Sequence, residues 1–230
     1  MSLVEQREGI EAGRLDMFVD GAFAFTLTLL AIGGESIPDS SGKLLQLLRD
    51  VPASALCFAQ IALMWHGHVR WRQMCHVNTR RGLLLSLMLV FFALIFVYPV
   101  HMVYASLCNA LSNGALSPEF KLLTPTDVRA VFACYGLAYA CMSGTLVLLF
   151  RHAATQAHAL MHDALKPRVE AVTWSMPAIV GLVSAVIAVS LPDSTPGWLW
   201  PLPGYLYFLL ILTGPVLRVF RRRYGRGAAA

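Results

Sequence analysis

Apolar residues gather in six long blocks along the chain, and short polar segments separate them. The blocks lie at about Met17–Gly33, Val51–His68, Gly82–Leu107, Val128–Phe150, Val169–Leu191 and Gly197–Val219. A helix needs about 20 mostly apolar residues to cross the roughly 30 Å hydrocarbon core of a bilayer. Runs such as Leu83–Phe92 do not alternate, which argues against a transmembrane β-barrel. We therefore predict an all-α membrane protein, a six-transmembrane-helix bundle that forms a single transmembrane domain over residues 1–230.

The composition supports a membrane protein and argues against a soluble enzyme. Hydrophobic residues make up 57% of the chain and charged residues only 13%, whereas soluble domains carry roughly 25% charged residues. The sequence contains no nucleophile elbow, no zinc-binding H-E-x-x-H and no phosphate-binding loop. We expect no enzymatic activity and no bound cofactor.

Lys and Arg are unequally distributed between the segments on the two sides of the predicted membrane. Fourteen of the 18 Lys and Arg lie in the N-terminal segment, after the second and fourth blocks, and in the C-terminal tail. Because cytoplasmic segments are enriched in Lys and Arg, both termini are predicted to be cytoplasmic. The basic tail, with Arg218 and Arg221 to Arg223, is expected to meet anionic lipid headgroups rather than nucleic acid.

The first block carries charged residues, which are costly inside a membrane and point to a structural or functional role. Successive residues of an α-helix are about 100° apart, so one face of about 80° collects six positions. These are Arg14, Phe18, Gly21, Phe25, Thr28 and Ile32. Asp20 lies about 80° or more from each of them. Such a face fits either helix packing, with a small Gly21 at the contact, or a pore with apolar rings and a hydroxyl ring.

A resemblance to a known family favours the pore. Arg14-x-x-x-Phe18-Val19-Asp20-Gly21, followed by Phe25, Thr28, Leu29 and Leu30, resembles the signature of the endolysosomal potassium channel family. The resemblance is closer to the single-repeat bacterial members of that family. Their pattern is Arg-x-x-x-Phe-Ser-Asp, so Val19 stands here in place of the usual Ser. Further along, Trp65-His66-Gly67-His68 partly resembles the family's Trp-x-x-His-His, and Asn78 and Pro99 are similar to family positions.

The resemblance implies a homotetramer in which the first helix of each subunit lines a central pore. Phe25 would then form the narrowest apolar ring, Thr28 would contribute to ion preference, and Ile32 would form a further apolar ring. The pore-helix scaffold would include Arg14, Phe18, Asp20, Gly21, His68 and Asn78. Asp20 would brace the pore helix through Arg14, His68 or Asn78. The permeant ion would be potassium, and the membrane would be a bacterial inner membrane.

Phe25 departs from the family pattern, where Leu or Ile is usual at this position. Four phenyl rings around one axis would plug a pore more completely than smaller side chains. We therefore expect a pore that is closed or conducts poorly at rest.

Three other functions are compatible with parts of the sequence. A proline-broken last block and an intramembrane carboxylate suit a secondary transporter, which is the main alternative, although the sequence has no internal repeat. His66, His68, His76 and His101 raise the possibility of a haem-binding bundle, but only His101 lies well inside a block. His158 and His162 are spaced to share a metal on one helix face, but we expect a solvated cytoplasmic helix there.

Overall fold

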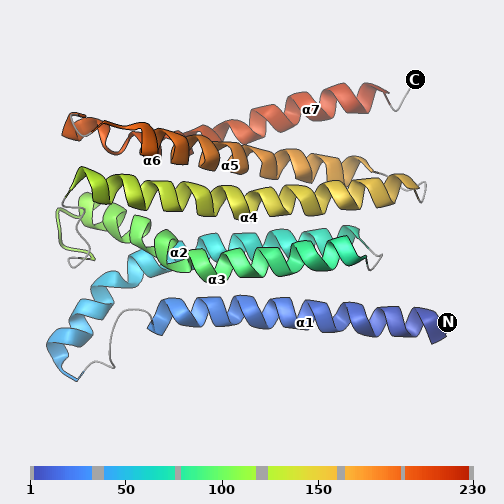
Figure 1. Ribbon diagram of the computed structural model, residues 1–230, viewed down its shortest axis with the longest axis horizontal. Helices are drawn as coiled ribbons and strands as arrows, with labels where there is room; N and C mark the ends of the chain where they lie inside the picture. The colour runs from blue at the N-terminus through green and yellow to red at the C-terminus, as the bar shows by residue number, and fades with distance from the viewer. Residues whose placement is uncertain are drawn as a thin grey trace.

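The computed structural model of the chain describes residues 3–32, 39–75, 79–117, 124–159, 164–192 and 195–227. In the first of these ranges side chains are described for residues 13–30, and in the last as far as residue 220. All the regular structure of these residues is helical (Figure 1). The elements are α1 (Leu3–Ile32), α2 (Ser41–Met74), α3 (Arg80–Leu111), α4 (Pro125–Ala159), α5 (Leu165–Ser190), η1 (Gly197–Leu199), α6 (Leu202–Tyr205), η2 (Leu206–Leu212) and α7 (Thr213–Gly227).

Five of the six predicted blocks coincide with helical segments long and apolar enough to cross a membrane. They are α2, α3, α4, α5 and the combined segment Gly197–Phe220. The predicted first block lies within α1, apart from Gly33, which is outside the described residues. The described side chains of α1, residues 13–30, include three charged ones, Arg14, Asp16 and Asp20. The most apolar 18-residue stretches of the other five segments hold at most two charged residues each. A sixth span therefore stays a prediction.

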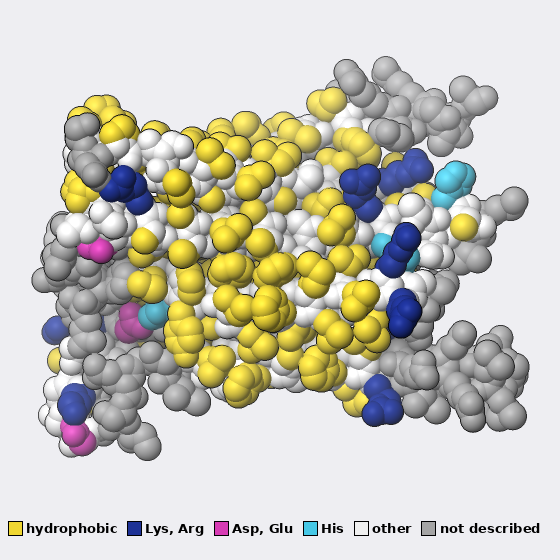
Figure 2. Space-filling view, viewed as in Figure 1, with side chains coloured by type: hydrophobic (Ala, Val, Ile, Leu, Met, Phe, Trp, Pro, Cys, Tyr) yellow, Lys and Arg dark blue, Asp and Glu magenta, His cyan; other side chains and the backbone are white. Residues whose placement is uncertain are grey.

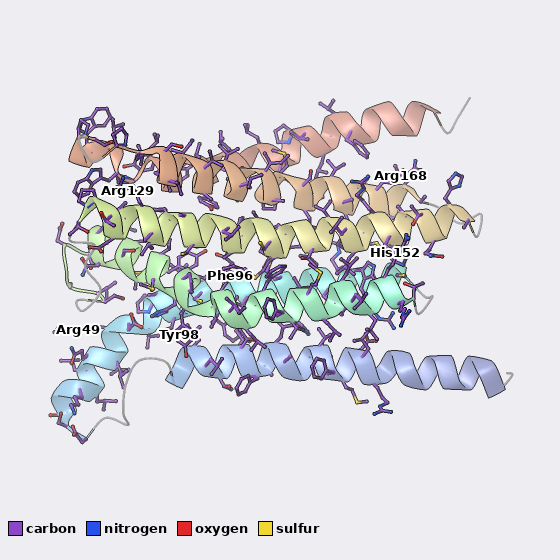
Figure 3. All side chains as sticks on the ribbon, viewed as in Figure 1. Arg49, Phe96, Tyr98, Arg129, His152 and Arg168 are labelled. Carbon is purple, nitrogen blue, oxygen red and sulfur yellow. The ribbon has the colours of Figure 1, made fainter. Side chains whose placement is uncertain are left out.

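The long helices run roughly side by side, and α1 lies at one edge of the bundle (Figure 1). It contacts α2 and α3, while α4 and α5 form the most extensive helix pair. The chain termini lie at one end, together with the α2–α3 and α4–α5 junctions. His152 and Arg168 mark this end, whereas Arg49 and Arg129 lie at the other (Figure 3). In Figure 2 a broad hydrophobic band separates charged side chains at the two ends, as a bilayer requires.

The last membrane segment is irregular, as its prolines predict. Pro201 and Pro203 flank the start of the short helix α6, and a 3-10 run, η2, follows it before α7 begins. Proline lacks the backbone N–H that an α-helix needs, so the freed carbonyls require other partners inside a membrane. A side chain of α5 also contacts this irregular segment, because the Ser184 hydroxyl donates to the carbonyl oxygen of Pro203 at 2.9 Å.

Small residues let α4 and α5 approach until their backbones touch. A Cβ placed on Gly136 would lie 2.6 Å from the carbonyl oxygen of Gly181, and one on Gly181 would lie 2.7 Å from that of Gly136. Close backbone approach is a common way of packing helices in lipid, where burial of apolar groups provides little net attraction. These two helices form the most extensive helix pair of the bundle.

A buried polar cluster joins α2 to α3 and α4 in the middle of the bundle. The side-chain carbonyl oxygen of Gln60 accepts hydrogen bonds from the hydroxyls of Tyr104 and Tyr135. The Tyr135 ring also packs edge-on against Tyr207. A polar group that is buried in an apolar environment is costly unless it is hydrogen-bonded, so these bonds fix the relative positions of the three helices.

Candidate functional site

The helix α1 has one buried face and one free face within the subunit. Val19 and Thr26 are 0% exposed and Phe23 is 2% exposed, because they pack against the bundle. Phe18 and Phe25, in contrast, are each 56% exposed. The remaining described members of the predicted pore face, Arg14, Gly21 and Thr28, are also exposed. We call these five residues the free face of α1. The side chain of Ile32, which was predicted to extend this face, lies outside the described residues.

Two threonines of α1 have opposite environments. Thr26 is buried, and its hydroxyl donates to the Ala22 carbonyl oxygen at 2.8 Å. The Thr28 hydroxyl lies on the free face and donates to the Phe25 carbonyl oxygen at 2.7 Å. A hydroxyl has one proton and two acceptor lone pairs. Because the Thr28 proton is used on its own helix, the oxygen presents its lone pairs outward, which is the polarity that a cation requires.

Two carboxylates of α1 hold the helix against α2. The indole N–H of Trp65 donates to Asp20 Oδ1 at 2.8 Å. One turn earlier on α1, Asp16 Oδ1 lies 2.8 Å from Arg72 Nε in an ion pair. The two acidic residues are four apart on α1 and their partners are seven apart on α2, so each pair shares one helix face. We call these two contacts the α1 brace.

His68 connects α2 to α3 rather than to α1. Its side chain is 2% exposed, and its Nε2 lies 2.9 Å from the Ser86 hydroxyl oxygen. The Ser86 hydroxyl donates to the carbonyl oxygen of Gly82 at 2.9 Å. The single Ser86 proton is therefore in use, which makes His68 Nε2 the donor in its own hydrogen bond. This bond orients the ring beside Trp71, with ring centroids 5.2 Å apart.

Asp20 has a hydrogen-bond partner that was not predicted. Arg14, His68 or Asn78 was expected to bind it, and the structure shows a hydrogen bond from Trp65. His68 is directed into the bundle toward Ser86, so Trp65 is the α2 side chain that reaches Asp20. Asn78 lies outside the described residues. The scaffold roles of Arg14, Phe18, Gly21 and His68 stay predictions.

Three residues of this region were not predicted from the sequence, namely Asp16, Arg72 and Ser86. A signal for the first was present, because Asp16 lies one turn before Asp20 on the same side of the helix. A pair of carboxylates so close to the membrane core implies basic or hydrogen-bonding partners on the neighbouring helix. The sequence alone did not identify which face of α2 would provide them.

The helix α2 is also anchored on its other side. Arg70 forms an ion pair with Glu170 of α5. A Cβ on Gly67 would lie 2.7 Å from Trp174 Cζ2 and 2.9 Å from Leu146 Cδ1, so only glycine fits there without rearrangement. The position of α2, and through it that of α1, is therefore fixed from both sides.

The other histidines form neither a haem pair nor a metal centre among the described residues. His101 Nε2 lies 2.9 Å from Asp50 Oδ2 and 3.3 Å from the Ser54 hydroxyl, at the opposite end of the bundle from His152. No group of three His, Cys, Asp or Glu able to hold a metal occurs in the part of the chain that was described. His158 is exposed, while His76 and His162 lie outside the described residues.

Comparison with known proteins finds similarity to one family over the first part of the chain. The family model for the endosomal/lysosomal potassium channel TMEM175 matches residues 14–99, which begin in the free face of α1 and end at Pro99 of α3. Over these residues the chain is similar to the TMEM175 potassium channels. The resemblance drawn from the α1 motif is thereby confirmed.

Relatives of the TMEM175 kind match almost the whole chain. A curated protein of Marivirga tractuosa, named as a potassium channel, is 24% identical over 228 residues, covering 93% of this chain and 88% of its own. A crystal structure of a variant of the potassium channel MtTMEM175, bound to a nanobody fusion protein, matches with a TM-score of 0.77. The two chains are 23% identical, and 93% of each is covered.

A second crystal structure is more distant. It is a lysosomal potassium-selective channel TMEM175 homologue from Chamaesiphon minutus, with 19% identity and a TM-score of 0.59. The match covers 90% of this chain and 98% of the homologue. These structures support the TMEM175 fold for this chain. With its apolar helices, the chain is an integral membrane protein, and the relatives it matches are named as channels rather than enzymes.

Proposed function

We propose that this chain is a potassium-preferring cation channel whose pore is lined by α1 from each of four subunits. The observation that carries the proposal is the free face of α1. Phe18 and Phe25 are more than half exposed, although equivalent residues on the opposite face of the helix are fully packed. The names of the relatives as potassium channels support the same function.

The free face is poorly suited to contact lipid. It carries Arg14 at one end and Thr28 toward the other, with two phenylalanines between them. A guanidinium on a lipid-facing stripe is costly unless it reaches the interface. A ring of four such helices around an axis would instead place Arg14 at a wet mouth and the phenylalanines along a narrow passage. This arrangement accounts for the charged and aromatic residues of the free face.

The chemistry of such a passage follows from the order of its rings. Four Phe25 side chains would form an apolar constriction that empties of water when it is narrow. Thr28 follows one turn later and offers hydroxyl oxygens, which can replace part of the water shell of a cation. Ile32 would add an outer apolar ring. We propose that the larger Phe25 keeps this constriction closed or poorly conducting at rest.

The α1 brace would keep the pore helix in place while ions pass. Asp16 and Asp20 point to α2 and not to the free face, so we assign them to positioning rather than to ion selection. The other members of the proposed scaffold are Arg14, Phe18, Gly21, His68 and Asn78. Both termini would lie in the cytoplasm of a bacterium, with the C-terminal arginines near anionic headgroups of the inner membrane.

Flux from liposomes tests the function directly. Purified protein is placed in potassium-loaded liposomes, and an uncoupler lets protons enter to balance potassium efflux, which a proton-sensitive dye reports. We expect the wild type to give little or no potassium efflux, and any efflux to be lost when sodium replaces potassium. The Phe25→Ala variant should increase this efflux if the wild-type pore is closed. A rate that saturates at low turnover, without unitary current steps in bilayers, would instead favour the transporter. The absence of potassium efflux from both the wild type and Phe25→Ala would contradict the proposed channel.

A further inference from the structure

A basic groove runs between α4 and α5 at the end of the bundle that carries the chain termini. Its volume is about 300 Å³, and its walls come from three helices. Arg151 and Ala154 belong to α4, Arg168 and Val172 belong to α5, and Phe220 of α7 closes one side. An adjoining hollow of about 200 Å³ shares Arg151, Ala154 and Arg168 and extends along α4 to His158.

The groove is polar at one end and apolar at the other. Arg151 follows directly after the predicted membrane block of α4, and Arg168 directly precedes that of α5. Deeper in the bundle the walls are formed by Val147, Val172 and Ser175. This order reproduces the order of groups in a phospholipid, which has a charged phosphate at the interface and an acyl chain below it.

Two small residues create the space between the arginines. Ala154 and Ala171 are 7% and 8% exposed and form the floor of the groove, so larger side chains there would fill it. The carboxylates that the structure describes are paired elsewhere or distant, since Glu170 binds Arg70 and Asp16 binds Arg72. Within the described part of the chain, neither Arg151 nor Arg168 forms an ion pair with a carboxylate. Two exposed guanidiniums therefore line one groove, and among the described residues no carboxylate forms an ion pair with either of them.

We infer that this groove binds the phosphate headgroup of an anionic phospholipid, with one acyl chain lying along Val147, Val172 and Phe220. Basic pockets between transmembrane helices are suited to anionic headgroups, and guanidinium groups match the geometry of phosphate oxygens. The site is separate from the free face of α1 and from the arginines of the C-terminal tail. It would couple the α4–α5 pair to the composition of the membrane.

The test is lipid binding by the full chain in detergent, measured by native mass spectrometry during titration with phosphatidylglycerol or phosphatidylcholine. We expect the wild type to prefer phosphatidylglycerol. The double variant Arg151→Gln, Arg168→Gln should bind it about 25-fold more weakly, since each basic side chain at an anionic surface contributes about fivefold. The matched control is Arg80→Gln, Arg81→Gln, which removes two exposed arginines at the same end but outside the groove. It should bind like the wild type.

A second variant tests whether the open space of the groove is needed, apart from its charge. Val172→Trp would fill the apolar part of the groove, whereas Val183→Trp places the same bulk at an exposed position of the same helix. We expect the first to lose the phosphatidylglycerol preference and the second to keep it. Equal weakening by both arginine pairs, or full binding by Val172→Trp, would overturn the proposal. Displacement of the lipid by inorganic phosphate would also overturn it, because the ligand would then be a free anion.

Discussion

At the scale of single residues, neighbouring identical side chains of α1 take different roles. Phe23 and Thr26 are buried against the bundle, while Phe25 and Thr28 belong to the free face. Helical periodicity explains this division, because residues two apart differ in direction by about 200°. The structure adds that the predicted pore face is unpacked within the subunit. Phe23 and Thr26 on the buried face therefore serve as matched controls for Phe25 and Thr28 on the free face.

Phe25→Ala and Phe23→Ala should have opposite effects. Removing the ring of Phe25 widens the proposed constriction and leaves the subunit packing unchanged, so potassium flux should rise with little loss of stability. Removing Phe23 leaves a cavity in the core, which typically costs about 3–5 kcal/mol. Liposome flux and thermal unfolding in detergent measure the two properties. A Phe25→Ala protein with no greater flux than wild type would count against the constriction.

Thr28→Ala should reduce ion preference, whereas Thr26→Ala should not. The first change removes outward-facing oxygens from the proposed pore, and the second removes a hydroxyl that bonds only its own helix. We expect the potassium-to-sodium permeability ratio to fall in Thr28→Ala and to stay at its wild-type value in Thr26→Ala. Reversal potentials under potassium–sodium gradients give this ratio. Equal ratios in both variants would place ion selection elsewhere.

At the scale of elements, α2 is the helix that positions α1. The sequence predicted the four middle helices and the broken last segment, because long apolar runs and prolines act locally. It did not predict the pairing of Asp16 with Arg72 or of Asp20 with Trp65. Those contacts depend on how far α2 is rotated about its axis, and Gly67 and Arg70 set that rotation through contacts with distant helices. Long-range packing of this kind leaves no periodic signal in the chain.

The ion pair between Asp16 and Arg72 should contribute measurably to stability. Their side chains are 37% and 16% exposed, so solvent screens the pair only in part. A double-mutant cycle with Asp16→Asn and Arg72→Gln should give a coupling free energy of about 1 kcal/mol. The same cycle on Lys43 and Asp39, which are 45% and 69% exposed, should give close to zero. Equal coupling free energies would mean that the Asp16–Arg72 ion pair stabilises the protein no more than an exposed ion pair does.

Gly67→Ala should destabilise the bundle, because its new methyl group would collide with Trp174 and Leu146. Overpacking of this kind costs about 1–3 kcal/mol. Gly144→Ala is the control, since a Cβ on Gly144 meets nothing within 4 Å in the subunit. Thermal unfolding in detergent compares the two variants. A Gly67→Ala protein as stable as Gly144→Ala would show that α2 is held less tightly than the contacts imply.

At the scale of the whole molecule, the free face of α1 lies at the edge of the subunit and does not pack against the other helices. The unequal distribution of basic residues predicted which loops and termini share an end, and the bundle places them together. The number of copies could not be derived from the pattern of one chain, because an intersubunit surface and a lipid surface are both apolar. Four copies follow from the resemblance alone. The mass of the solubilised complex should therefore correspond to four chains of 25.2 kDa.

The central claim is that ions pass along the free face of α1. Thr28→Cys and Thr26→Cys, each combined with Phe25→Ala so that the pore conducts, are recorded in planar bilayers before and after addition of a positively charged methanethiosulfonate reagent. We predict that the reagent reduces potassium current through the Thr28→Cys protein, but not through the Thr26→Cys protein or Phe25→Ala alone, which keeps the five native cysteines. Block of Thr26→Cys with Thr28→Cys unaffected would contradict the account.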